Sequence, residues 1–182
     1  MIDVAFVTGS SGKIGNALVA HLLKKNILVI GIGRFSKDST IAIKIFENRE
    51  INLNIDKSIV LNKWVRLEES NLINLFETEK DKKIQSYFFH LAWEGASSLT
   101  DGSYEKQIYN VGLSAKYLDL SKKLNVFKFI NSGSIDEIYL ERCMQSKNFK
   151  KIENFQHLEY GIAKLATRDI LSFKSYVENI DF

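Results

Sequence analysis

A glycine-rich turn near the N-terminus constrains the fold of this chain more than any other feature of its sequence. The turn, Thr8-Gly9-Ser10-Ser11-Gly12-Lys13-Ile14-Gly15, directly follows a short apolar run at Ile2–Thr8. Apolar residues at helical spacing then continue over Lys13–Lys25. The sequence therefore predicts a strand, a tight turn and a helix, in that order, at the start of the chain.

The spacing of the three glycines indicates a dinucleotide-binding turn. Gly9 permits the tight exit from the strand, and Gly12 lets a pyrophosphate approach the backbone without a Cβ in the way. Gly15 lets the helix pack close to the sheet, and the helix N-terminus offers free N–H groups to the phosphates. An ordinary glycine-rich turn remains the alternative, because a glycine trio by itself is a weak signal.

Strand-like apolar runs alternate with helix-like stretches along the rest of the chain. Further strands are expected at Ile27–Ile32, Trp64–Leu67, Ser86–Ala92 and Val126–Asn131, and further helices at Ser70–Glu79, Tyr104–Leu124 and Leu158–Val177. This alternation predicts the α/β class, a doubly wound parallel sheet (Rossmann fold) with helices on both faces.

Two stretches are harder to interpret. The polar region 36–61 is expected to hold a short helix near Ile41–Glu47. Ile180–Phe182 resembles the start of a sixth strand, so residues 1–182 are expected to form one NAD(P)-binding domain that ends there.

The end of the second strand predicts which dinucleotide is preferred. Eighteen residues after Gly15 the chain reaches Gly33 and then Arg34, with no acidic residue that would bind a ribose hydroxyl and repel a 2′-phosphate. A guanidinium can bind a phosphate in a bidentate fashion, so NADP(H) is favoured. If Arg34 is only a solvated surface residue, NAD(H) remains open.

A Tyr-x-x-x-Lys pair, Tyr160 and Lys164, lies on the last predicted helix. Residues four apart share a helix face, and a nearby ammonium lowers the pKa of a phenol from its usual value near 10. Ser134 lies 26 residues earlier, after the predicted strand that ends at Asn131, where a doubly wound sheet presents its ligands. The alternatives are an exposed pair four residues apart on a helix surface and a Ser/Gly-rich turn, both without catalytic chemistry. No metal site is predicted.

Together these residues resemble the extended short-chain dehydrogenases/reductases, the NAD(P)-dependent epimerase/dehydratase family that modifies sugar nucleotides. The resemblance implies that Ser134 orients the substrate, that Tyr160 is the general acid/base, and that Lys164 lowers the tyrosine pKa and holds the nicotinamide ribose. It also implies a nucleotide-linked sugar as substrate. The cofactor-binding residues that it implies in the turn are Gly9, Ser11, Gly12, Lys13, Ile14 and Gly15.

Other segments extend the resemblance. His90-Leu91-Ala92-Trp93 is similar to the family's His-Leu-Ala-Ala segment, which implies that Leu91, Ala92 and Trp93 line the cofactor. The tryptophan variant resembles enzymes that act on deoxysugars in surface-polysaccharide pathways. Asn110 matches an asparagine near the cofactor. His90 itself is expected to pack rather than react, because no partner acid is evident.

The resemblance also bears on completeness and assembly. Family members continue for about another hundred residues that form a substrate lobe of ordinary domain size, so this lobe is expected to be absent or truncated. Members often pair through the two long helices, which implies a homodimer. Two further interpretations stay open: a non-catalytic NAD(P)-binding module, and a fragment without an independent role.

Composition excludes some partners. The formal net charge is +3, from 25 basic and 22 acidic residues that are scattered rather than striped, so no nucleic acid is expected. No apolar run is long enough to span a bilayer, so no membrane is expected either. A single cysteine, Cys143, leaves no internal disulfide, and a cytoplasmic location is the expectation.

Overall fold

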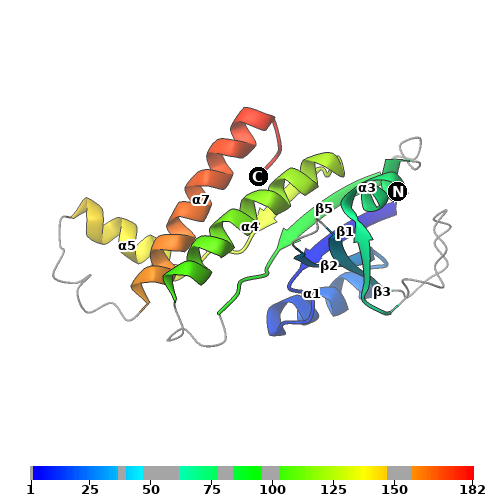
Figure 1. Ribbon diagram of the computed structural model, residues 1–182, viewed down its shortest axis with the longest axis horizontal. Helices are drawn as coiled ribbons and strands as arrows, with labels where there is room; N and C mark the ends of the chain where they lie inside the picture. The colour runs from blue at the N-terminus through cyan, green and yellow to red at the C-terminus, as the bar shows by residue number, and fades with distance from the viewer. Residues whose placement is uncertain (1, 37–39, 47–61, 78–83, 96–102, 147–156) are drawn as a thin grey trace. The chain divides into compact units, whose positions relative to one another are not determined.

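The computed structural model describes residues 2–36, 40–46, 62–77, 84–95, 103–146 and 157–182 (Figure 1). The chain divides into two compact units. The first, here the sheet unit, comprises Met1–Ala92 and Leu120–Ile130, and the second, here the helical unit, comprises Trp93–Asp119 and Asn131–Phe182. Each unit is described by itself.

The sheet unit is built on a six-stranded mixed sheet of order β4-β3-β2-β1-β5-β6. Its strands are β1 (Ile2–Thr8), β2 (Leu28–Phe35), β3 (Thr40–Phe46), β4 (Val65–Glu68), β5 (Ile84–His90) and β6 (Lys128–Asn131). β1 pairs in parallel with β2 on one side and with β5 on the other, while β3 pairs antiparallel with both β2 and β4. The Rossmann-like fold predicted from the sequence is confirmed, with β3 as a reversed strand inside it.

β3 replaces the helix that was expected at Ile41–Glu47, and that prediction was wrong over the described residues. Alternate side chains of this strand are buried, with Ile41, Ile43 and Ile45 nearly inaccessible. A period of two is the signature of a strand with one face covered. The alternation Ile-Ala-Ile-Lys-Ile, visible in the sequence, was the signal that this segment is a strand.

The core of the sheet unit lies where the first helix covers β1 and β2. α1 (Lys13–Lys24) turns Val19 and Leu22 onto Ala5, Val7 and Val29. β1 is buried on both faces, as expected for a strand at the centre of a parallel arrangement. The first strand, the turn and the first helix thus form as the sequence predicts. A further described helix of this unit is α3 (Glu69–Glu77).

Among the described residues, the helical unit holds α5 (Ile135–Gln145), α7 (Leu158–Glu178) and most of α4 (Tyr104–Lys123). The C-cap of α7 is Asn179, whose backbone adopts the left-handed conformation with φ +55°. Residues 180–182 after it form no strand, so the predicted sixth strand at Ile180–Phe182 is wrong. None of the described helices combines the length and the apolar character that a bilayer crossing demands.

Candidate active site

The glycine turn of the sheet unit is set by close backbone contacts. Gly9 has φ +67°, and a Cβ on it would lie 2.9 Å from the amide nitrogen of Ala92. A Cβ on Gly15 would lie only 2.1 Å from the carbonyl oxygen of Gly9. The tight approach at Gly15 is therefore to the turn itself rather than to the sheet. Gly9 and Gly15 are required for the turn to close.

Thr8 joins the turn to the end of β5. Its hydroxyl oxygen accepts hydrogen bonds from the amides of Leu91 and Ala92, each at 3.0 Å, and lies 2.8 Å from Nδ1 of His90. His90 is buried, which agrees with a packing role. These contacts hold the carboxyl ends of β1 and β5 together, which is the edge where sheets of this kind bind ligands.

The turn fits a dinucleotide phosphate group. Among the described residues, a Cβ at Gly12 would meet only the Gly9 carbonyl oxygen, at 3.2 Å, so these residues leave space above the α1 N-terminus. The Ser10 hydroxyl is buried and has no hydrogen-bond partner in the structure. An open glycine at a helix N-terminus suits a bound anion, whereas the Ser10 hydroxyl lies beside Gly31 of β2.

The other residues predicted to bind the cofactor from this unit are exposed or half-buried. Ser11, Lys13 and Ile14 are exposed around the start of α1, and Leu91 is half-buried after β5. Arg34 is the penultimate residue of β2 and is exposed. All of them lie in the glycine turn, at the start of α1, or near the carboxyl ends of β2 and β5.

Lys164 is the centre of the side-chain cluster in the helical unit. It is buried, and its Nζ donates a 2.9 Å hydrogen bond to the carbonyl oxygen of Ser132. The same Nζ lies 3.9 Å from the centroid of the Trp93 ring and 5.9 Å from that of Tyr160. Burial lowers the pKa of Lys164 to about 8, and the nearby Glu137 carboxylate opposes that shift. This ammonium is poised to titrate close to neutral pH.

Tyr160 and Ser134 lie within hydrogen-bonding reach of each other. Burial raises the pKa of the Tyr160 phenol, a hydrogen bond with the Ser134 side chain lowers it, and the charges of Asp136 and Glu137 raise it. The backbone N–H of Asp136 donates to the Ser134 hydroxyl oxygen at 3.2 Å, which leaves the hydroxyl proton for the phenol oxygen. The predicted trio of Ser134, Tyr160 and Lys164 is thus brought together.

One expectation about this trio is not met in the structure. The sequence predicted that Lys164 lowers the pKa of Tyr160, but the pKa is raised and Lys164 is not among the groups that shift it. The first physical reason is the burial of the phenol, and the Lys164 ammonium binds the Ser132 carbonyl and lies over the Trp93 ring.

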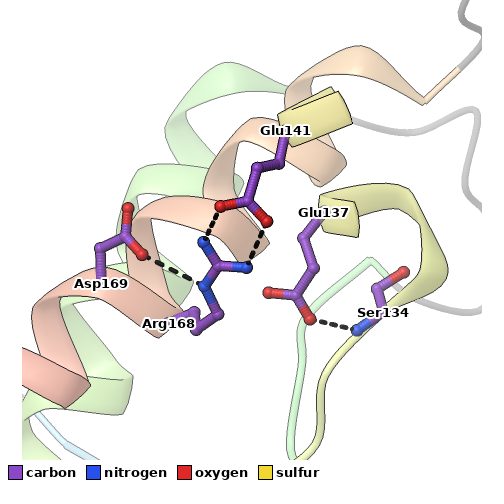
Figure 2. A network of polar contacts seen from close by, with 5 residues as sticks. All are labelled: Ser134, Glu137, Glu141, Arg168 and Asp169. Carbon is purple, nitrogen blue, oxygen red and sulfur yellow. Dashed lines mark hydrogen bonds and ion pairs between the residues drawn. The ribbon is translucent and has the colours of Figure 1, made fainter. Parts of the chain in front are cut away.

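α5 holds Ser134 in place by a capping box that the sequence analysis missed. Ser134 is the N-cap, and the Glu137 carboxylate accepts a 2.6 Å hydrogen bond from the Ser134 backbone N–H (Figure 2). Glu141 of α5 makes a bidentate pair with Arg168 of α7, at 3.0 and 3.1 Å. The Ser-x-x-Glu spacing at 134–137 was the signal that could have predicted this helix.

Asn110 and Gln107 of α4 act on the segment that follows β5. The Asn110 side chain accepts from the Glu94 N–H and donates to the Glu94 carbonyl, both at 2.9 Å. Gln107, which the sequence analysis did not single out, accepts a 3.0 Å hydrogen bond from the Trp93 indole. Asn110 therefore fixes the backbone beside Trp93. Among the residues described, no group of three or more His, Cys, Asp and Glu is placed to hold a metal ion.

The family is shown by a match to a family model. Residues 5–174 match the NAD dependent epimerase/dehydratase family. Because this match covers most of the chain, the protein belongs to that family. The recognition made from its motifs is confirmed. A comparison with curated proteins gives no significant match.

Solved structures share the fold at low sequence identity. UDP-N-acetylglucosamine 4-epimerase from Bacillus cereus is 19% identical with a TM-score of 0.58, over 99% of this chain and 51% of that one. UDP-glucose 4-epimerase from Thermotoga maritima is 20% identical with a TM-score of 0.54, over 97% of this chain and 52% of that one. This chain therefore spans about half the length of the structures that it resembles.

Proposed function

We propose that this protein is an NAD(P)-dependent enzyme that epimerises, dehydrates or reduces a nucleotide-linked sugar, with Tyr160 as its general acid/base. The observation that carries the proposal is the convergence of Ser134, Tyr160 and Lys164 in one cluster of a family member. The substrate class rests on the motif resemblance and on the names of the two epimerases, which act on UDP-sugars.

The roles proposed for the trio follow from their protonation. A phenol with a raised pKa is protonated at neutral pH and can donate its proton to a substrate oxygen. The Ser134 hydroxyl stabilises the phenolate that this leaves, since its hydrogen bond lowers the Tyr160 pKa. The Lys164 ammonium adds positive charge near the same ring. Proton return then regenerates the phenol.

The glycine turn is proposed to hold the pyrophosphate of the dinucleotide. Bound at Gly12 and the α1 N-terminus, the cofactor would supply a nicotinamide that accepts or returns hydride. The half-buried Ala92 and the neighbouring Trp93 are proposed to line it, and Lys164 to hold its ribose. We favour NADP(H) over NAD(H), because the end of β2 presents the guanidinium of Arg34 and no acidic side chain.

A homodimer through the long helices is part of the proposal. The supporting observation is a set of large apolar side chains that α4 and α7 leave exposed: Ile108, Tyr109, Ile170, Phe173, Tyr176 and Val177. Exposed apolar patches on single helices mark association surfaces. Light scattering on Phe173→Glu should give the monomer mass where the unaltered protein gives the dimer mass. A monomeric unaltered protein would refute this part.

A second candidate is a dinucleotide-binding module without turnover. It is favoured by the raised pKa of Tyr160, because burial and the charges of Asp136 and Glu137 disfavour its phenolate. Under this alternative the protein binds the cofactor but converts no nucleotide sugar.

The test combines a cofactor titration with turnover assays on nucleotide sugars. We expect NADP(H) binding, and a loss of turnover of roughly 10²- to 10⁴-fold in Tyr160→Phe with unchanged cofactor affinity. The matched control is Tyr104→Phe, an exposed tyrosine on α4 outside the apolar set proposed for the dimer, which should keep full activity. Full activity in Tyr160→Phe would refute the acid/base assignment, and binding without any turnover would favour the second candidate.

A further inference from the structure

Trp93 meets both reactive side chains of the candidate site through different parts of its ring. Its face lies 3.9 Å from Nζ of Lys164, measured to the ring centroid. Its ring meets that of Tyr160 at 5.7 Å between centroids and at 83°, an edge-on arrangement. The negative face of an indole attracts a cation, and the edge-on geometry is the preferred contact between two aromatic rings.

A hydrogen bond from the indole N–H fixes the plane of the Trp93 ring. Nε1 of Trp93 donates a 3.0 Å hydrogen bond to Oε1 of Gln107, whose side chain is buried on α4. The next residue, Glu94, has both its N–H and its carbonyl bound by the Asn110 side chain. α4 therefore holds the backbone and the ring of this segment at two separate points.

The Lys164 ammonium needs such a contact because it is nearly fully buried. A buried ammonium carries three donors and pays a large desolvation cost unless partners stabilise its charge. Among the described residues, the Ser132 carbonyl accepts one hydrogen bond, and the Trp93 face lies within range of a cation–π interaction. The two contacts together define where Nζ lies.

We propose that Trp93 is a positioning residue, whose indole face holds the Lys164 ammonium against the Ser132 carbonyl beside the Tyr160 ring, with Gln107 fixing the indole plane. Its consequence for catalysis rests on the function proposed above, because only then does the position of Lys164 affect turnover. The geometry itself is a property of the protein without cofactor or substrate.

The test is nuclear magnetic resonance on protein labelled with 13C at the lysine ε carbon. Protons on the ε carbon of Lys164 should resonate upfield of those of other lysines, because the indole face shields them. The signal is assigned by its loss in Lys164→Met. In Trp93→Leu, which keeps an apolar side chain but has no ring, the upfield position should be lost and the Lys164 pKa should fall by roughly 0.5 to 1 unit.

Three further variants separate the positioning role of the Trp93 indole from the effect of its size. Trp93→Phe keeps an aromatic face and should retain most of the upfield shift. Gln107→Leu frees the indole and should reduce it, whereas Gln107→Glu keeps an acceptor and should reduce it less. Trp64→Phe, in the sheet unit, is the matched control and should leave the Lys164 signal unchanged.

Other titrating groups near the pair must be separated from Lys164 itself. Those whose charge or proton acts here are Tyr160, Asp136 and Glu137. Repeating the titration in Tyr160→Phe removes the phenol, and the Lys164 transition should persist with a midpoint near pH 8.

The proposal is overturned if the Lys164 signal lies with the other lysines, or if Trp93→Leu, shown to be folded by circular dichroism, leaves its position and pKa unchanged. Neither outcome depends on turnover. A protein that shows the shielded lysine but converts no nucleotide sugar would contradict the proposed function and support this inference. With active protein, the pH profile of kcat should shift in Trp93→Leu by the same amount as the Lys164 pKa.

Discussion

The glycine turn of the sheet unit and the lysine cluster of the helical unit are built on different physical principles. In the turn, backbone meets backbone: Gly9 has a positive φ, and Gly15 lies against the Gly9 carbonyl. In the cluster, two side chains and one backbone carbonyl from separate segments meet: the Trp93 ring after β5, the Ser132 carbonyl after β6, and the Lys164 ammonium on α7.

The comparison shows why one region is robust and the other adjustable. Backbone sterics leave almost no choice of residue at Gly9 and Gly15, because any Cβ collides with atoms that cannot move cheaply. A side-chain cluster can rearrange, since the ammonium of Lys164 can exchange one set of partners for another through its flexible stem. The turn should therefore fail in an all-or-none manner and the cluster by degrees.

The largest effect on folding is expected from Gly15→Ala. Its Cβ would lie 2.1 Å from the Gly9 carbonyl oxygen, so the turn must open. We expect a loss of about 3 kcal/mol in the free energy of unfolding, measured by urea titration. The matched control is Gly112→Ala on α4, where a Cβ meets nothing within 4 Å, and where helix propensity should add about 0.5 to 1 kcal/mol. Equal effects of the two changes on the free energy of unfolding would show that the backbone contact at Gly15 does not constrain the turn.

Lys164→Met should instead stabilise the protein at neutral pH. The folded pKa of about 8 lies below the usual 10.5, so the unfolded chain binds this proton more tightly and the folded state is penalised below pH 8. Wild-type stability from this group should rise as pH increases from 8 to 10.5. We expect Met to raise the free energy of unfolding by about 2 kcal/mol at pH 7, after the loss of the contacts to Ser132 and Trp93.

The gain in Lys164→Met should shrink above pH 8, because the wild-type lysine then loses its charge. Urea titrations at pH 7 and pH 10 measure this directly. A gain that grows with pH, or a loss of stability at pH 7, would show that the cluster stabilises the fold instead of costing stability.

Gly12→Ala should affect binding and spare the fold. The Cβ would project into the open space above the α1 N-terminus and meet only the Gly9 carbonyl oxygen, at 3.2 Å. We expect about a tenfold loss in affinity for the dinucleotide, which corresponds to about 1.4 kcal/mol, measured by fluorescence titration. Unfolding by urea should be nearly unchanged. Unaltered affinity would remove Gly12 from the phosphate site.

The smallest effect is expected from Arg34→Ala. Removing the guanidinium should lower the affinity for NADP(H) several-fold and leave the affinity for NAD(H) unchanged, because only NADP(H) carries the 2′-phosphate. Parallel titrations with both cofactors check this. Equal losses for the two cofactors would contradict the preference proposed for NADP(H).

The difference between the two regions also sets how much of each could be predicted. The spacing of the glycines in the turn indicates the backbone conformation directly, so the strand, turn and first helix were predicted correctly. The helix expected at Ile41–Glu47 was wrong because buried and less buried side chains alternate there, which is the period of a strand. The predicted trio also came together, since strand ends and helix spacing are local properties.

What could not be predicted depends on which partner a flexible side chain selects. Nothing in the spacing of Tyr160 and Lys164 indicates that the ammonium turns to the Ser132 carbonyl and the Trp93 ring. The sequence does not predict the hydrogen bond of Gln107 with Trp93 either, because a buried amide on a helix can face many partners. Tertiary packing decides which partner each of these side chains contacts, and residue spacing alone does not encode it.

The central claim is that the indole face of Trp93 and the carbonyl oxygen of Ser132 hold the Lys164 ammonium beside the Tyr160 ring. The direct measurement is the nuclear magnetic resonance signal of the protons on the Lys164 ε carbon, in the unaltered protein and in Trp93→Leu. The account predicts a signal upfield of those of the other lysines in the unaltered protein, and its return towards them in Trp93→Leu. A Lys164 signal that lies with the other lysines in the unaltered protein would contradict it.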